Sequence, residues 1–215
     1  MEIKTAPLGK LGTNFYIVTD EASKKAFVVD PGADSEIAAS LIKNTGCDLQ
    51  YIILTHAHAD HIGALDFLKC EFPDAKIVIH ALEADSLSDD RYNLCSYFYM
   101  QSPSSKADII VNDNEILYLG ENKLKILHTP GHTKGSISIL TDEFLISGDT
   151  LFQCSIGRSD FPGGDYDTII NSIKTKLFIL DDCLTVYPGH GNPTTIKYEK
   201  QNNPFLNWGK TWSLY

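Results

Sequence analysis

Thr55-His56-Ala57-His58-Ala59-Asp60-His61 follows directly on the apolar run of residues 51–54, Tyr-Ile-Ile-Leu. A short run rich in β-branched and aromatic residues predicts a buried strand, so the polar residues come where that strand ends. Imidazole and carboxylate are the side chains that zinc and similar divalent metals prefer. The end of a strand is also where open α/β sheets bind ligands. The stretch therefore predicts a metal site at a sheet edge.

The spacing within this stretch predicts two metals. His56 and His58 lie two positions apart on a chain that is leaving a strand, so both can point at one ion. Asp60 and His61 are adjacent and follow the turn, where they can face a second ion. Three histidines and an aspartate behind one strand favour metal binding over a polar loop with solvated histidines.

Three further turns supply the remaining ligands. His132 follows the apolar segment 123–127, Asp149 follows 144–147, and His190 follows 184–187. A glycine precedes each of them, which suits tight turns and a close approach of the backbone to an ion. We expect the first metal to bind His56, His58 and His132, the second to bind Asp60, His61 and His190, and Asp149 to bridge the two.

These motifs carry a family resemblance. T-H-A-H-A-D-H, T-P-G-H-T, G-D-T-L-F and P-G-H-G occur in this order and resemble the metallo-β-lactamase superfamily. The loop 157–165, G-R-S-D-F-P-G-G-D, is similar to that of short bacterial glyoxalase II-like (hydroxyacylglutathione hydrolase-like) proteins. The resemblance covers residues 1–206. It implies an α/β fold, the four-layer αββα sandwich, with the metal site at one edge between two sheets.

Composition agrees with a globular enzyme. The 215 residues are 43% hydrophobic and 21% charged, which suits one domain over residues 1–215 with a large core. No secretory signal or membrane-length apolar stretch is visible, and the five cysteines form no C-x-x-C pair. We therefore expect a cytoplasmic protein with reduced thiols and no membrane association. The net charge of −10 argues against nucleic-acid partners.

The resemblance implies a hydrolase for thioesters such as S-lactoylglutathione. A hydroxide that bridges two divalent metals would attack the thioester carbonyl, with Asp60 as a catalytic residue as well as a ligand. Zinc is the metal expected, with iron or manganese as alternatives. Two divalent ions carry four positive charges, of which Asp60, Asp149 and the hydroxide would neutralise three. About one positive charge would remain to attract an anionic oxygen. The expected partner is a small-molecule thioester, bound by a monomer or a homodimer.

Arg158 is the candidate substrate-binding residue. By resemblance it stands near the basic position that meets the glutathione carboxylates. It could hold a substrate carboxylate through two hydrogen bonds, or it could only tie its own loop through Asp160 or Asp165. Only 25 residues follow His190, so the helical region that grips glutathione in full glyoxalase II proteins is not expected here. The thiol portion therefore need not be glutathione.

Three other functions remain open. A mononuclear-iron persulfide dioxygenase on the same scaffold would use only His56, His132 and Asp149. A non-enzymatic metal-binding module would use the same ligands without turnover. A β-lactamase is disfavoured, because those relatives usually carry a cysteine in the place of Asp149.

Some groups stand apart from the predicted ligands. His80 and His128 are predicted not to bind metal, and Cys154 is interpreted as structural because no basic residue adjoins it. The aromatic segment 89–105 could be a lid that brings Tyr97, Phe98 or Tyr99 to the substrate, or it could pack on the flank of the domain. The aromatic tail 207–215 is expected to fold back or to form a dimer contact.

The pattern also predicts the main elements. Helices are expected at 34–43, 62–72, 81–87, 165–180 and 194–199. A hairpin is expected at 14–18 and 25–30, a strand at 76–79, and a meander of strands from 108 to 147.

Overall fold

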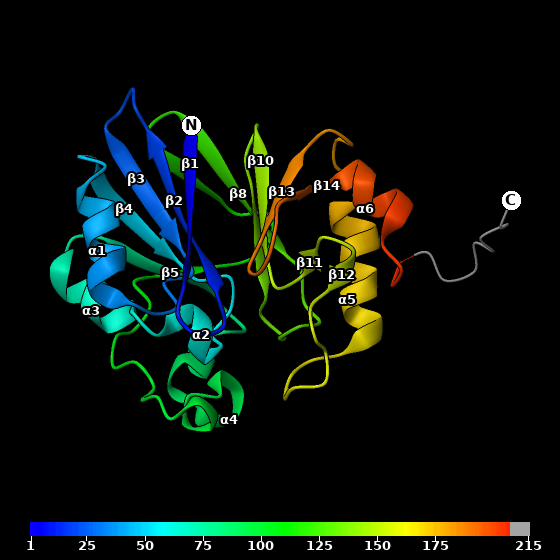
Figure 1. The fold of residues 1–215 in the computed structure, drawn as a ribbon, viewed down its shortest axis with the longest axis horizontal. Helices are drawn as coiled ribbons and strands as arrows, with labels where there is room; N and C mark the ends of the chain where they lie inside the picture. Colours follow the sequence, from blue (N-terminus) through cyan, green and yellow to red (C-terminus); the bar gives the residue numbers. More distant parts are fainter. Residues whose placement is uncertain (207–215) are drawn as a thin grey trace, which may run out of the picture.

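The computed structural model describes residues 1–206 and shows two six-stranded sheets packed face to face, with helices on both outer sides (Figure 1). The first sheet has the order β1 (Glu2–Leu8), β2 (Thr13–Asp20), β3 (Lys25–Val29), β4 (Asp48–Ile53), β5 (Lys76–His80) and β6 (Ile109–Val111). The second has the order β14 (Thr194–Thr195), β13 (Thr185–Pro188), β10 (Phe144–Gly148), β9 (Ile137–Leu140), β8 (Asn122–His128) and β7 (Ile116–Leu119).

Helices complete the outer layers. The first sheet is covered by α1 (Ser35–Lys43) and α3 (Leu65–Glu71), and the second by α5 (Tyr166–Ser172) and α6 (Ile196–Asn202) (Figure 1). A π-helical turn, Ile173–Leu177, continues α5. The shorter elements are α2 (Ala59–Ile62), α4 (Asp90–Asn93), the 3₁₀ turns Ala84–Ser88 and Ser96–Phe98, and the hairpin β11 (Leu151–Phe152) and β12 (Ser155–Ile156).

Three apolar cores separate the four layers. In β2, Phe15 and Ile17 pack in the core beneath α1 and α3, whereas Tyr16 and Val18 pack between the two sheets. This alternation follows from the two-residue period of a strand. A third core joins the second sheet to α5 and α6. The predicted αββα sandwich is confirmed.

The structure corrects several element predictions. The helix expected at 62–72 is two helices, because the backbone N–H of Ala64 donates to Pro31 O at 2.8 Å instead of continuing a helical ladder. The first of them, α2, includes Asp60 and His61, which we expected on the loop after the turn. The segment 81–87 forms a 3₁₀ turn from Ala84 rather than a helix.

Strand pairing corrects the rest. Strand β6 pairs in parallel with β5 in the first sheet, so the meander begins only at β7. Strand β1 was not predicted, and 194–199 begins as β14 before α6. Helix α5 starts after Asp165, whose side chain accepts the N–H of Thr168 at 2.7 Å.

Within residues 1–206, no helix combines the length and apolarity needed to cross a membrane.

Candidate metal centre

Strands from both sheets end at the same edge and present the predicted ligands there. In the second sheet β10 and β13 run parallel, so Asp149 and His190, which follow them, leave on the same side. The backbone joins the sheets at this edge, because Ile137 N donates to Thr55 O at 2.9 Å and Asn14 N donates to Gly189 O at 2.7 Å. The turns that carry the ligands are therefore fixed by main-chain bonds.

His56, His58 and His132 converge as the first predicted set. The Nε2 atom of His132 lies 3.2 Å from Nε2 of His56 and 2.9 Å from Nδ1 of His58. All three side chains are buried. Burial, together with the neighbouring imidazoles, lowers the pKa of His56 and lowers the pKa of His58 to about 3. The rings are therefore neutral, which is the form that binds a metal.

Asp60, His61 and His190 form the second set. Nε2 of His190 lies 3.2 Å and Nε2 of His61 lies 3.6 Å from Oδ2 of Asp60. Burial disfavours a charged imidazole at His61, but Asp60, Asp149 and Asp30 outweigh it and raise the pKa of His61. The carboxylates around His61 therefore favour a positive charge in this part of the site.

Asp149 lies between the two sets. Its Oδ1 is 3.5 Å from Nε2 of His61, and its Oδ2 is 3.6 Å from Nε2 of both His132 and His190. Within residues 1–206, His58 Nε2, His61 Nε2 and Asp149 Oδ1 are buried without a hydrogen-bond partner. Buried polar atoms without a partner are costly, and a cation that binds His61 Nε2 and Asp149 Oδ1 would remove that cost. The predicted ligands therefore offer a donor set that fits divalent metal ions.

Gly189 shows why a small residue must precede a ligand. A Cβ atom built on Gly189 would lie 2.0 Å from Oδ1 of Asp149 and 2.9 Å from Cε1 of His61. Any larger residue would displace the central carboxylate. Gly148 allows the tight turn before Asp149, since its φ of +50° is a backbone conformation that favours glycine.

Asp30 is a functional candidate that the sequence prediction missed. Its Oδ2 lies 2.9 Å from Nδ1 of His61 and accepts the Thr55 hydroxyl at 2.6 Å, while its Oδ1 accepts the N–H of Thr55 at 2.7 Å. These contacts orient His61 so that its Nε2 faces Asp60 and Asp149. Asp30 directly follows β3 as the ligands follow their strands, and that context could have identified it.

Glu83 is a second missed residue and gave no local signal. Its carboxylate is buried and accepts the N–H of Ala57 at 3.1 Å, the N–H of Gly135 at 2.9 Å and the hydroxyl of Thr133 at 2.9 Å. Ala57 stands between two histidines of the first set, and Thr133 follows the third. Glu83 therefore ties together both turns that carry this set.

A cleft of about 650 Å³ is lined by five of the seven predicted ligands: His58, Asp60, His132, Asp149 and His190. Arg158 is the only lysine or arginine among the described residues that line it. Its guanidinium donates to both oxygens of Asp160, at 2.9 and 2.8 Å, and lies 4.1 Å from the ring centre of Phe161. Of the two predicted ways to tie this loop, the structure has the pair with Asp160; Asp165 caps α5 instead.

The segment 89–105 reaches the cleft, as the lid hypothesis expects. Leu94, Tyr97 and Phe98 line it, whereas Tyr99 is 99% exposed and does not. The tail 207–215 lies outside the described residues.

The two excluded histidines belong to none of the groups of described residues that could hold a metal ion. His80 and His128 stack on each other, with ring centres 4.1 Å apart and planes 11° apart. All five cysteines are free. Cys154 is exposed and its Sγ lies 3.7 Å from the hydroxyl of Tyr198, so it does not line the cleft.

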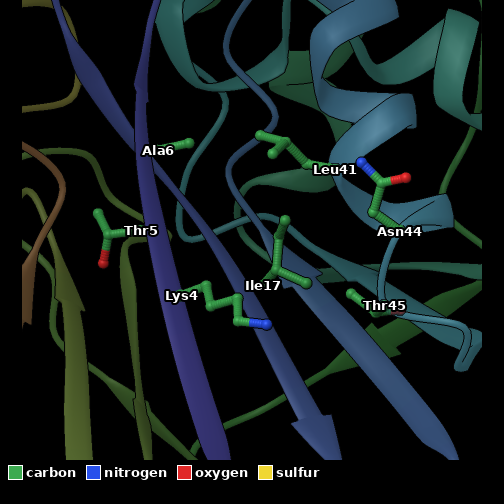
Figure 2. Close-up of a pocket in the computed structure, with 7 residues that line it drawn as sticks. All are labelled: Lys4, Thr5, Ala6, Ile17, Leu41, Asn44 and Thr45. Carbon is green, nitrogen blue, oxygen red and sulfur yellow. The ribbon is translucent and has the colours of Figure 1, made fainter.

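A separate cavity of about 380 Å³ lies between the β1–β2 hairpin and α1 (Figure 2). Its described lining includes Lys4, Ile17 and Leu41 but no histidine, cysteine or carboxylate. It therefore offers none of the side chains that hold zinc or a similar metal, and the cleft over Asp149 is the candidate site.

Comparisons with known proteins agree with this geometry. The family model described as the metallo-beta-lactamase superfamily matches residues 8–190. The chain belongs to this superfamily. It is 36% identical to hydroxyacylglutathione hydrolase GloC of Haemophilus influenzae, over 96% of this chain and 99% of that protein.

Two solved structures are also similar to this superfamily member. The crystal structure of BLEG-1 B3 metallo-beta-lactamase is 37% identical with a TM-score of 0.90, over 96% of this chain and 100% of that one. The structure of TTHA1623 in a di-iron-bound form is 31% identical with a TM-score of 0.83, over 94% of this chain and 100% of that one. Both solved structures thus share this fold over their whole length.

Proposed function

We propose that this protein is a metal-dependent hydrolase of the glyoxalase II type that cleaves S-acyl thioesters such as S-lactoylglutathione. The observation that carries the proposal is the convergence of six histidine and aspartate side chains in two sets around Asp149. The 36% identity to a hydroxyacylglutathione hydrolase over nearly the full length of both chains supports the choice of substrate class.

The donor set suits two zinc ions, with iron as an alternative that the di-iron relative supports. Bound divalent ions can lower the pKa of water to about 7 and polarise a carbonyl oxygen. Asp60 faces the cleft, and its Oδ2 accepts the hydroxyl of Thr13 at 3.0 Å. Although burial opposes it, His61 and His190 lower the pKa of Asp60. Asp60 is therefore an ionised acceptor that can orient the attacking water.

Arg158 is the residue that we assign to a substrate carboxylate. Its present partner Asp160 forms an ion pair in which both side chains are largely exposed, and such pairs contribute only about 0–1 kcal/mol. A substrate carboxylate can therefore replace Asp160 at little cost. The Phe161 ring, 4.1 Å from the guanidinium, attracts this cation and helps to hold it at the cleft.

β-Lactam hydrolysis is the second candidate, because one similar structure is a B3 metallo-beta-lactamase at 37% identity. The same cleft and the same donor set would serve an amide carbonyl. The two functions differ in the bond that breaks, so they are separated by substrate.

The test is a direct comparison of substrates with protein loaded separately with zinc, iron or manganese. We expect S-lactoylglutathione to be hydrolysed with a kcat/KM of about 10⁴ M⁻¹s⁻¹ or more, and a penicillin at least about 100-fold less efficiently. His132→Ala is the control for metal-dependent turnover. A preference for the penicillin would favour the lactamase. Oxygen uptake with glutathione persulfide, without thioester hydrolysis, would favour the dioxygenase.

A further inference from the structure

The cleft has two chemically different ends, and each end lies beside one of the two ligand sets. At the end of the first set, the backbone oxygen of Arg158 lies 2.6 Å from Nδ1 of His132, and the ring centre of Phe161 lies 5.6 Å from that of His58. The Arg158 guanidinium, paired with Asp160, is the cationic group of this end. Tyr97 also lines the cleft.

The opposite end is apolar. The ring of Phe152 lies 6.2 Å from that of His190, and the backbone oxygen of Leu11 lies 3.3 Å from Nδ1 of the same histidine. Leu11 is half exposed and Phe152 partly buried, and both line the cleft. Both therefore present apolar surface beside the second set. We call the surface formed by Leu11 and Phe152 the apolar wall.

We propose that the apolar wall is the acyl subsite and that it selects thioesters whose acyl group carries a large apolar substituent, such as a phenyl ring. This inference rests on the proposed function, because a thiol portion with a carboxylate would occupy the Arg158 end and direct the acyl group to the other end. A lactoyl group ends in one methyl group, which leaves most of the wall in contact with water. A phenyl substituent would cover that wall, and burial of apolar surface favours binding.

The test compares two glutathione thioesters that differ only in this substituent: S-lactoylglutathione and S-(2-hydroxy-2-phenylacetyl)glutathione. We expect the zinc-loaded protein to show the higher kcat/KM for the phenyl compound. Phe152→Ala and Leu11→Ala should each lower the phenyl-to-methyl ratio of kcat/KM about tenfold, which is within the range for one apolar contact. Phe67→Ala, which removes an exposed phenylalanine of α3 outside the cleft, should leave the ratio as it is.

Arg158→Ala separates the two ends. It should lower kcat/KM for both thioesters by the same factor, because it acts on the shared thiol portion. A ratio near one in the native protein, or one that Phe152→Ala does not change, would overturn the acyl subsite while leaving thioester hydrolysis intact.

A binding measurement keeps the wall testable if no thioester is hydrolysed. The free acids, lactate and 2-hydroxy-2-phenylacetate, share a hydroxyl and a carboxylate, so calorimetry reports the phenyl group alone. Tighter binding of the phenyl acid, lost in Phe152→Ala, would keep the apolar subsite and reject only the thioesterase. Equal affinities would reject the subsite itself.

Discussion

Asp149 is the residue whose two oxygens face both ligand sets, whereas Asp60 faces the second set alone. We therefore expect Asp149→Asn to weaken both metals and Asp60→Asn to weaken chiefly one. Turnover should fall at least about 100-fold in Asp149→Asn, a loss near that of one transition-state stabilising group. Elemental analysis after reconstitution with excess zinc and dialysis measures the metal content.

Asp160→Asn is the matched control, because this exposed acid pairs with Arg158 and lies in neither set. It should retain two metals per chain. Two metals and near-normal turnover in Asp149→Asn would show that this carboxylate does not bridge.

The sequence pattern predicted the site residues that directly follow a strand. It did not predict the residues whose hydrogen-bond partners lie far away along the chain. His132, Asp149 and His190 each stand after an apolar strand and a glycine, a pattern that is local and visible. Asp30 has the first half of that pattern. Glu83 has none, because its partners Ala57 and Gly135 lie 26 and 52 positions away along the chain.

At the scale of the elements, Glu83 holds together the two turns that carry the first set through its hydrogen bonds. Glu83→Gln keeps the shape but replaces one acceptor oxygen with an N–H donor, which leaves at least one buried donor unpaired. Burial raises the pKa of Glu83 and its three hydrogen bonds lower it in part. We expect a loss of about 1–3 kcal/mol in the free energy of unfolding and weaker zinc retention against a competing chelator.

Glu199→Gln provides the control for that experiment. Glu199 is equally buried and accepts Cys154 N at 3.0 Å and the Thr194 hydroxyl at 2.6 Å, and these partners lie in neither of the turns that carry the first set. It should lose comparable stability with no change in zinc retention. Identical zinc retention in the two variants would mean that Glu83 has no specific role at the metal site.

Elements were predictable where their signals were local. The helix α1 was placed nearly to its ends because Pro31-Gly32 precedes it and Gly46 follows. The break between α2 and α3 was not visible, since it depends on the Pro31 carbonyl reaching Ala64. Strand β6 looked like the start of a meander, and only its pairing with β5 places it in the first sheet.

At the scale of the whole molecule, the family motifs implied the four layers, but periodicity alone did not. Strand β2 is buried along its whole length, so its sequence shows no polar face that would indicate which side meets helices and which meets a sheet. That assignment requires both partner layers, which are contributed by residues far apart in the chain.

The candidate metal centre joins the two sheets, because His56 and His58 follow β4 of the first sheet and His132 follows β8 of the second. Bound metals should therefore stabilise the whole fold. With free metal at a thousand times its dissociation constant, one site contributes about 4 kcal/mol. For a chain of this size, that corresponds to a rise in Tm of roughly 8–16 °C. We expect EDTA to lower Tm by that amount in thermal unfolding followed by circular dichroism, and added zinc to restore it. His132→Ala, which lacks one ligand of the first set, should respond less to either reagent. A Tm that EDTA leaves unchanged, in protein shown to have lost its metal, would mean that the sheets are held by their apolar core without any contribution from the ions.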